Sequence, residues 1–445
     1  MRSFIFLSTL AFLLVNQSTA QIFTKKNITR ESLTNSDTYS GIVTESYANG
    51  KPKVWRELEN GKAEGLWLEW YPNGTLRYRA YWQNGLGNGK WEYFHENGQL
   101  RVEGVYEKDL PQGLFKYYHP NGTKASEEVY VNGEKYGIFY QWDKNGILID
   151  EQLFLKGERV LNKPVLFEPG NITSDTANEW DIAFTPDSET LYFTRRIPGG
   201  SSYIYKSELD DNGRWSIPEK TSFTRSAEGG VFITQDGRRM YTESPEMLPG
   251  NAQFQKSDFN IWYRIKKGKE WTNPYPVSGL INQVMQPEEE WPTNYEAGAS
   301  TDKEGNLYYW SGSTSGKGSS IYSAELKKDG TFEKPKELAI SLAHDGYDSG
   351  PVISPDGNYL FFASSGRSDG LGGEDIYYSK KVNGIWSNPK NLGPEINTSG
   401  NEGFPRFSPD GSYFFFSSDR DSKKAKPDEK IASIYYMETK YLLID

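Results

Sequence analysis

The stretch from Gly400 to Arg420 reads GNEGFPRFSPDGSYFFFSSDR, two aromatic runs joined by a Pro-Asp-Gly turn. A close copy, YDSGPVISPDGNYLFFASSGR, runs from Tyr347 to Arg367. Runs rich in aromatic and β-branched residues, broken by Gly, Pro, Asn and Asp, predict β-strands joined by tight turns. The chain is therefore expected to use this hairpin more than once.

Alignment on the turn yields five copies, and each copy continues in the same way. A second aromatic strand follows the turn, and then come a loop of variable length, a third strand such as IYKSEL or IYYSKKV, and a fourth strand. Four short antiparallel strands per copy, repeated radially, predict a β-propeller. The turns centre on Asp187, Asp236, Glu304, Asp356 and Asp410.

The last copy ends after its third strand, and the missing strand is expected at the other end of the array. The segment Asn162 to Ile172, NKPVLFEPGNI, reads like SNPKNLGPEIN at Ser387 to Asn397. Pairing of the first segment with the last copy closes the ring and removes exposed sheet edges. We expect five blades; a sixth, degenerate blade between Asp236 and Glu304 is the alternative.

A different repeat occupies residues 41 to 160. Its glycines recur every 24 residues, and an Asn-Gly pair lies in each repeat between alternating apolar and polar runs, as in LWLEWYPNGTLRYRAY. Asn-Gly between such runs is a strong signal for a tight hairpin. Five equal hairpins predict a ribbon whose neighbours bury one another's aromatic faces. His95 and His119 share one repeat position, which favours a role in turn packing over a metal pair.

These patterns resemble two known families, and together they make the expected fold class all-β. Residues 41–160 resemble MORN-type repeats in the bacterial variant labelled antitoxin-like. Residues 161–445 resemble the Pro-Asp-motif propellers of the TolB type, which are common in exported bacterial proteins. The resemblance implies fold more than function, because such propellers host protein docking, sugar binding and lyase chemistry alike.

The N-terminus and the composition indicate an exported protein. Arg2, the apolar run FIFLSTLAFLLV and the small residues that end at Ala20 predict a signal peptide over residues 1–20, followed by a linker over 21–40. The apolar run is too short to span a membrane, and no later run reaches that length. The chain has no cysteine, which excludes disulfides and thiol chemistry, and its net charge of −10 argues against nucleic acid. We expect a periplasmic or secreted protein.

One acidic residue lies eight positions before each turn centre, so the five acids are expected to surround one mouth of the channel. A repeated position is commonly repeated for structure, with each acid accepting backbone hydrogen bonds. The alternative is a cation site, since clustered carboxylates favour a hard cation such as calcium. No other cofactor is predicted. The acids are Glu179, Glu228, Glu296, Asp348 and Glu402.

Residues that break the repeat are the candidates for chemistry. His344 and Tyr347 lie in AHDGYDSGP, on the loop that enters an inner strand, and Arg406 replaces a small or apolar residue of the other copies. Other arginines and aromatic residues are expected at the same rim, where guanidinium groups bind anions and rings stack on sugars. This predicted substrate-binding set is Arg195, Arg196, Arg367, Arg420, Trp180, Trp291 and Tyr295.

The function that we expect from this rim is binding of oligosaccharides that contain uronic acid, including sulfated ones. Propellers that resemble this one include lyases, so the alternative of catalysis takes the form of β-elimination. Arg406 would neutralise the uronate carboxylate, His344 would remove the neighbouring carbon-bound proton, and Tyr347 would protonate the leaving group. A second hypothesis is a non-enzymatic envelope scaffold, in which both repeat arrays dock an envelope protein.

Overall fold

The computed structural model describes residues 39–210, 213–225, 227–250, 258–342, 344–422, 431–442 and 444. The predicted signal peptide and nearly all of the predicted linker lie outside this part of the chain. The described residues divide into two compact units, one up to Val160 and one from Leu161 onward. In the described ranges, no helix combines the length and the apolar character that crossing a membrane requires.

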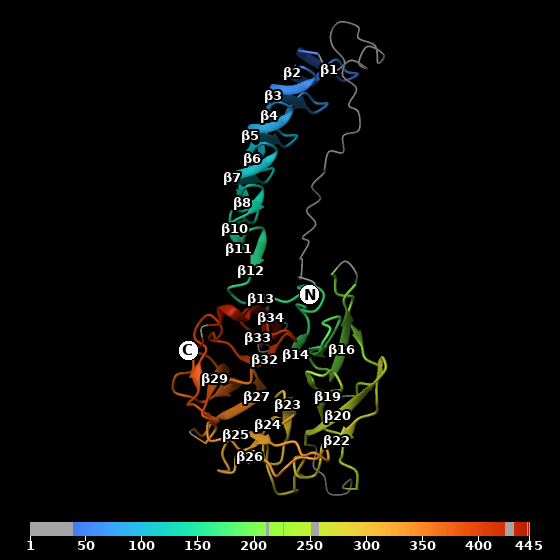
Figure 1. Ribbon diagram of the computed structural model, residues 1–445, viewed down its shortest axis with the longest axis vertical. Coiled ribbons are helices and arrows are strands. Elements are labelled where there is room, and N and C mark those ends of the chain that lie inside the picture. Colours follow the sequence, from blue (N-terminus) through green and yellow to red (C-terminus); the bar gives the residue numbers. More distant parts are fainter. Residues whose placement is uncertain are drawn as a thin grey trace. The chain divides into compact units, whose positions relative to one another are not determined.

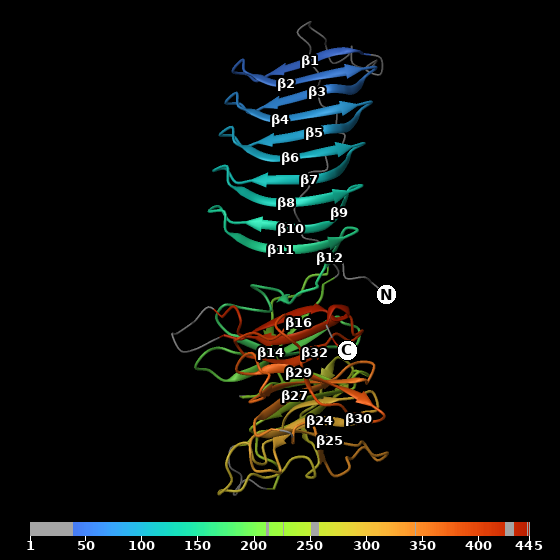
Figure 2. The ribbon, with the colours of Figure 1, turned by 90° about the vertical axis from the view of Figure 1, so that its left-hand side faces the viewer.

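The first unit is a single antiparallel sheet in which consecutive strands pair, with the short β9 also pairing with β8 (Figure 2). This is the predicted succession of hairpins. The strands are β1 (Gly41–Ser46), β2 (Pro52–Glu59), β3 (Lys62–Trp70), β4 (Leu76–Gln83), β5 (Leu86–Phe94), β6 (Leu100–Glu107), β7 (Leu110–Tyr118), β8 (Lys124–Val131), β9 (Glu134–Lys135), β10 (Gly137–Trp142), β11 (Leu148–Leu155) and β12 (Glu158–Val160).

The Asn-Gly turns stack on one another along one side of this sheet, at the ends of the strands. Gly74 adopts a φ of 89°, which only glycine reaches without strain, and the Asn73 amide donates to the Glu96 carbonyl of the next turn. His95 Nε2 lies 2.8 Å from the Tyr118 carbonyl oxygen, one repeat further along the chain. His119 makes the corresponding contact. The prediction that these histidines pack turns is confirmed.

Aromatic rings connect the hairpins across one face of the sheet. Consecutive ring centroids lie 4.1–6.0 Å apart, so each ring is in contact with the next. Because each hairpin contributes rings to both neighbours, no single hairpin buries its own face alone. The ladder consists of Trp67, Trp82, Trp91, Tyr106, Phe115, Tyr130, Phe139 and Phe154.

The second unit is built from short antiparallel strands in chain order around a common centre (Figure 1). The strands are β13 (Val165–Leu166), β14 (Asn178–Phe184), β15 (Thr190–Arg196), β16 (Ser202–Glu208), β17 (Glu219–Lys220), β18 (Gly229–Ile233), β19 (Arg239–Ser244), β20 (Asn260–Lys267), β21 (Glu270–Trp271), β22 (Tyr275–Pro276), β23 (Ala297–Thr301), β24 (Leu307–Gly312), β25 (Ser319–Ala324), β26 (Lys336–Glu337), β27 (Tyr347–Ile353), β28 (Tyr359–Ser365), β29 (Asp375–Val382), β30 (Ile385–Trp386), β31 (Lys390–Asn391), β32 (Glu402–Phe407), β33 (Tyr413–Ser418) and β34 (Ser433–Glu438); a short 3-10 helix, η2 (Thr439–Tyr441), follows.

The first strand of each predicted copy lies innermost. Strand β14 contacts β18, β18 contacts β23, β23 contacts β27, β27 contacts β32, and β32 contacts β14. The sheets themselves are β14–β17, β18–β22, β32–β34 with β13, and a larger sheet from β23 to β31 that is joined by one parallel pair, Ser319 with Tyr347. Apolar side chains fill the space between neighbouring sheets; Phe361 and Phe414, for example, have ring centroids 5.4 Å apart.

The segment predicted to complete the last copy does pair with it. Val165 and Leu166 of β13 pair with Tyr436 and Tyr435 of β34. The sheet order is β13–β34–β33–β32, so its outer strand comes from the beginning of the unit and its other strands come from the end.

Candidate functional site

The five repeated acids are buried at the start of the inner strands. Each carboxylate accepts hydrogen bonds from its own sheet or from the loop that enters it. Glu402, for example, accepts from the Thr398 backbone N–H and from the Ser418 hydroxyl at 2.7 and 2.6 Å. The described residues contain no group of three or more acids, histidines or cysteines arranged to hold a metal ion. This geometry supports the structural interpretation of the repeated acid.

Three of the four rim arginines predicted to bind substrate are instead engaged with these acids. Arg195 pairs with Glu179 at 3.0 Å, and Arg367 pairs with Asp348 at 2.9 Å. Arg420 Nη2 lies 3.9 Å from Glu402 and also donates to the Ile396 carbonyl. Their side chains are no more than 15% exposed, so little of their donor capacity faces solvent.

A fourth acid–arginine pair uses a residue that the sequence analysis missed. Arg264, in the middle of β20, contacts Glu228 at 2.6 Å and is fully buried. The sequence did distinguish Arg264, because the matching position in the other third strands holds Ser207, Ala324, Ser379 or Met437. A charged residue in place of a small or apolar one marks a buried partner.

His344 is tied into the same network. Its Nε2 lies 3.0 Å from Asp348 Oδ1, and its Nδ1 accepts from the Gly346 backbone N–H at 3.0 Å. Burial opposes ionisation of Asp348, yet the His344 hydrogen bond and the Arg367 charge together hold the pKa of that carboxyl below its ordinary value. Both ring nitrogens of His344 are therefore engaged within its own sheet.

Tyr347 and Arg406, the other proposed catalytic residues, lie apart from each other. Tyr347 is the first residue of β27 and is exposed. Arg406 lies near the turn end of β32, where it lines a cavity that neither His344 nor Tyr347 lines. The three residues therefore do not converge on that cavity.

A cluster of aromatic rings forms a platform at the start of the inner strands. Trp291, 55% exposed, stacks on Tyr347, 41% exposed, with centroids 5.2 Å apart and planes 20° apart. Tyr295 stacks on Trp310 at 5.2 Å, and Trp291 contacts both rings edge to face. Phe259 packs on Tyr295. Two flat, exposed rings supported by three others are suited to holding a flat apolar ligand face.

The structure thus brings together Trp291 and Tyr295 of the predicted substrate-binding set with Tyr347, which was predicted as catalytic, and it adds Trp310 and Phe259. Trp310 had a detectable signal, since it is the single tryptophan among the second strands of the five copies. Charged residues flank the platform: Lys317 pairs with Asp345 at 2.7 Å, and both are exposed.

The remaining two predicted residues form a smaller group. Arg196, at the end of β15, lies 5.9 Å from the ring of Trp180, and that ring lies 6.2 Å from Phe404. Arg196 is exposed, unlike the other three predicted arginines. Strands β14 and β15 are antiparallel, so the end of β15 lies beside the start of β14. This group therefore lies at the start of an inner strand, as the platform does.

Of the five repeated acids, Glu296 is buried without an arginine partner in the described part of the chain, and this affects how the stability of the protein depends on pH. Burial raises the pKa of Glu296 to about 8, against the hydrogen bonds from Gln283 N–H and the Ser311 hydroxyl, and nearby Asp258 adds to the rise. The folded protein therefore keeps a proton that the unfolded chain releases at about pH 4.5, so the free energy of unfolding should fall as pH rises from about 4.5 to about 8.

Glu296→Gln removes this titration and should make the decline shallower without abolishing it, because burial also raises the pKa of Glu179 and of Glu243 to about 7. Urea unfolding at several pH values across that range measures the slope. Glu288→Gln, at an exposed position of the same loop, serves as the control and should keep the wild-type slope. Equal slopes for wild type and Glu296→Gln would contradict the prediction.

Comparisons with known proteins relate the chain to one family model and to several solved structures. The model of the MORN repeat variant matches residues 63–84, 88–108 and 111–132, which confirms MORN-type repeats there. The chain is similar in structure to a putative TolB from Agrobacterium tumefaciens (20% identity, 59% of this chain and 77% of that chain, TM-score 0.37). It is also similar to TolB from Acinetobacter baumannii (13% identity, 68% and 59%, TM-score 0.36). A levansucrase from B. megaterium matches as well (13% identity, 60% and 84%, TM-score 0.39). No curated protein sequence matches the chain.

Proposed function

We propose that this is an exported protein whose second unit is a closed propeller of five blades that binds oligosaccharides at one mouth. The cyclic contacts among five inner strands and the pairing of β13 with β34 support the ring. The observation that carries the binding function is the stacked, exposed pair Trp291 and Tyr347. The apolar faces of sugar rings stack on such side chains, and hydroxyl groups remain in water.

The ligand that we favour contains uronic acid. Arg196 beside Trp180 is an exposed cation placed to meet a carboxylate or a sulfate, and Lys317 beside the platform is exposed but would have to exchange its Asp345 partner for the ligand anion. We favour binding over β-elimination, because both His344 nitrogens are hydrogen-bonded within the protein. Carbon–oxygen lyase activity at this site is the alternative, and new near-ultraviolet absorbance on a polyuronate would reveal it.

Trp291→Ala should weaken oligosaccharide binding by about thirtyfold, the effect of losing about 2 kcal/mol at a central aromatic contact. Isothermal titration with a panel of neutral and uronate oligosaccharides measures the effect. Tyr275→Ala, an exposed tyrosine outside the platform, should leave the affinity unchanged. If no oligosaccharide binds wild type at millimolar concentration, the proposal is wrong.

A protein-docking scaffold remains a second candidate, and one observation favours it. On the face of the first unit opposite the aromatic ladder, large apolar side chains are exposed along successive hairpins, namely Ile42, Tyr81, Val105, Leu114 and Ile138. Repeat arrays commonly offer such surfaces to partners. Isothermal titration with oligosaccharides distinguishes the two candidate functions, since a protein-docking scaffold should give no heat with any oligosaccharide.

A further inference from the structure

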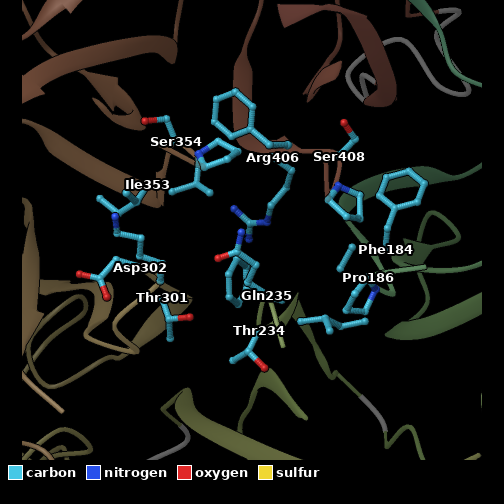
Figure 3. A pocket seen from close by; sticks show the side chains of 18 of the residues that line it. Phe184, Pro186, Thr234, Gln235, Thr301, Asp302, Ile353, Ser354, Arg406 and Ser408 are labelled. Atoms are coloured by element: carbon cyan, nitrogen blue, oxygen red, sulfur yellow. The ribbon is translucent and has the colours of Figure 1, made fainter. Parts of the chain in front are cut away.

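A concave site lies between the third and fourth copies, at the turn ends of their inner strands. Figure 3 shows Asp302 of the third copy and Ile353 of the fourth on one side of the central cavity that the five turns surround. The same two residues also line a neighbouring cavity of about 350 Å³. None of the platform residues lines this second cavity, so it is a separate site. The turns over residues 302–306 and 356–358 supply most of its wall, and Tyr308, Lys381 and Trp386 complete it.

The cavity lies where the third copy departs from the repeat. In the other four copies a backbone hydrogen bond closes the turn between residues five apart, as from the Thr185 N–H to the Thr190 carbonyl at 2.8 Å. In the third copy the Asp302 N–H instead donates to the Asn306 carbonyl, four residues on. This turn is therefore one residue shorter than its four counterparts, and less of the chain fills the space beside it.

A contact between neighbouring turns is also missing at this junction. Gly237 of the second copy lies against Pro186 of the first, so that a Cβ on this glycine would come within 2.9 Å of the proline ring. The junction of the fourth and fifth copies repeats the contact. In the third copy Lys303 takes the place of the proline, and a Cβ on Gly357 of the fourth copy would meet nothing within 4 Å. The cavity therefore occupies a place that is filled at other junctions.

Two side chains in the wall carry hydrogen-bonding groups that are paired with each other at another junction. Where the first and second copies meet, Trp271 Nε1 donates to the Tyr192 hydroxyl at 3.1 Å. Trp386 and Tyr308 hold the same positions between the fourth and third copies, and their rings pack at a similar distance, 6.5 Å against 6.4 Å. In the described part of the chain, however, no residue hydrogen-bonds to the Tyr308 hydroxyl or to Trp386 Nε1.

Tyr308 gives this cavity a buried polar group. The residue is only 6% exposed, and it lines the cavity. Burial and the charges of Asp302 and Glu304, which line the same cavity, raise the pKa of Tyr308, so the hydroxyl keeps its proton and can both donate and accept. Buried polar groups are nearly always hydrogen-bonded, so the Tyr308 hydroxyl points to a partner inside the cavity.

The charges around the cavity are mixed, and this decides the class of ligand. A carboxylate or sulfate would meet three acidic side chains, and an ammonium would meet two lysines and the Trp386 donor. A hydroxyl group is both a donor and an acceptor, so a neutral compound with several hydroxyls can bond to acids and lysines alike. The acidic side chains are Asp302, Glu304 and Asp356, and the basic ones are Lys303 and Lys381.

We propose that this cavity binds a neutral hexose, with one hydroxyl on Tyr308 Oη, a second accepting from Trp386 Nε1, and others on the charged rim. The cavity volume lies in the range of about 300–1,000 Å³ that is usual for small-molecule sites. This site is independent of the oligosaccharide site proposed at the platform, because it lies at the turn ends of the inner strands and the platform lies at their starts.

Isothermal titration of full-length Trp291→Ala protein with D-glucose, D-galactose and D-mannose tests the proposal away from the platform. At least one of these hexoses should bind. The corresponding uronate, in which a carboxylate replaces the hydroxymethyl group, should bind at least about tenfold more weakly because it meets the three acids. Lys303→Trp, at an exposed position of the rim, should abolish the binding by filling the cavity, and it leaves Tyr308 in place.

Tyr308→Phe removes the hydroxyl alone and should weaken hexose binding by about tenfold, the scale of one lost hydrogen bond. Its Tm should not change, because that hydroxyl has no partner among the described residues. The matched control is Tyr192→Phe, which removes a hydroxyl bonded to Trp271 and should lower Tm but leave the hexose affinity unchanged. Absence of hexose binding at millimolar concentration, a uronate that binds as tightly, or unchanged affinity in Tyr308→Phe would overturn the proposal. None of these outcomes bears on the platform, which is tested by comparing wild type with Trp291→Ala.

Discussion

Replacing Arg264 with methionine should lower the free energy of unfolding by about 3–5 kcal/mol, because it leaves the Glu228 carboxylate buried without its cation. Arg264 is fully buried, pairs with Glu228 at 2.6 Å and donates to the Thr242 hydroxyl at 3.1 Å. Its guanidinium also lies 4.7 Å from the ring of Phe223. Urea unfolding followed by tryptophan fluorescence measures the loss.

The matched control is Arg238→Met, in the turn that joins β18 and β19 of the same sheet. Arg238 is mostly exposed and lies 3.9 Å from Asp236, so its loss should cost less than about 1 kcal/mol. Adding Glu228→Gln to Arg264→Met removes the stranded charge and should recover part of the stability. A single Arg264→Met variant as stable as wild type would show that Glu228 does not need this partner.

Local patterns made most of the fold predictable. The Asn-Gly and Pro-Asp-Gly turns can be recognised from a few consecutive residues, and the apolar runs on either side of each turn predict the strands. The pairing of β13 with β34 was also predictable, although the strands are far apart in sequence, because the repeat has a visible missing strand. Because the copies repeat, this long-range contact could be predicted by comparing the last copy with the others.

The site was harder to predict because charged residues were assumed to face solvent. Arg195, Arg367 and Arg420 end or follow the second strands of three copies, and exposure is the common state of arginine. In the structure each reaches a buried acid of its own copy. Since both members recur together in the repeat, the recurrence itself indicated a pair. Arg196 has no such acid and stays exposed.

The contact between Asp181 and Arg406 shows a limit of a different kind. Each residue departs from its repeat position, Asp181 where glycine recurs and Arg406 where small or apolar residues recur. No local pattern connects two positions that are 225 residues apart. Only the ring, by bringing the first and last inner strands together, shows that the two departures compensate each other.

Removal of residues 21–158 should leave the second unit folded, whereas removal of residues 21–176 should not. The shorter cut keeps Leu161, whose backbone groups bond to Glu438, and keeps β13 on β34. The longer cut removes Leu161, Phe167 and Ile172 from a buried cluster with Phe415, and each is worth about 2 kcal/mol of burial. That loss is comparable with the whole stability of an ordinary domain.

The longer cut also exposes the edge of β34, a strand of mostly buried residues that then has no outer partner. An open apolar edge pairs with other chains, so this protein should aggregate or melt far below the 21–158 deletion. Light scattering and thermal unfolding of the two purified deletions measure the difference. The double substitution Val165→Pro and Leu166→Pro in the 21–158 deletion, which still contains β13, removes the hydrogen bonds of β13 without shortening the chain further. This variant should aggregate or melt early, as the 21–176 deletion does. Equal Tm values for the two deletions would mean that β13 does not close the ring, and the five-blade count would fall with it.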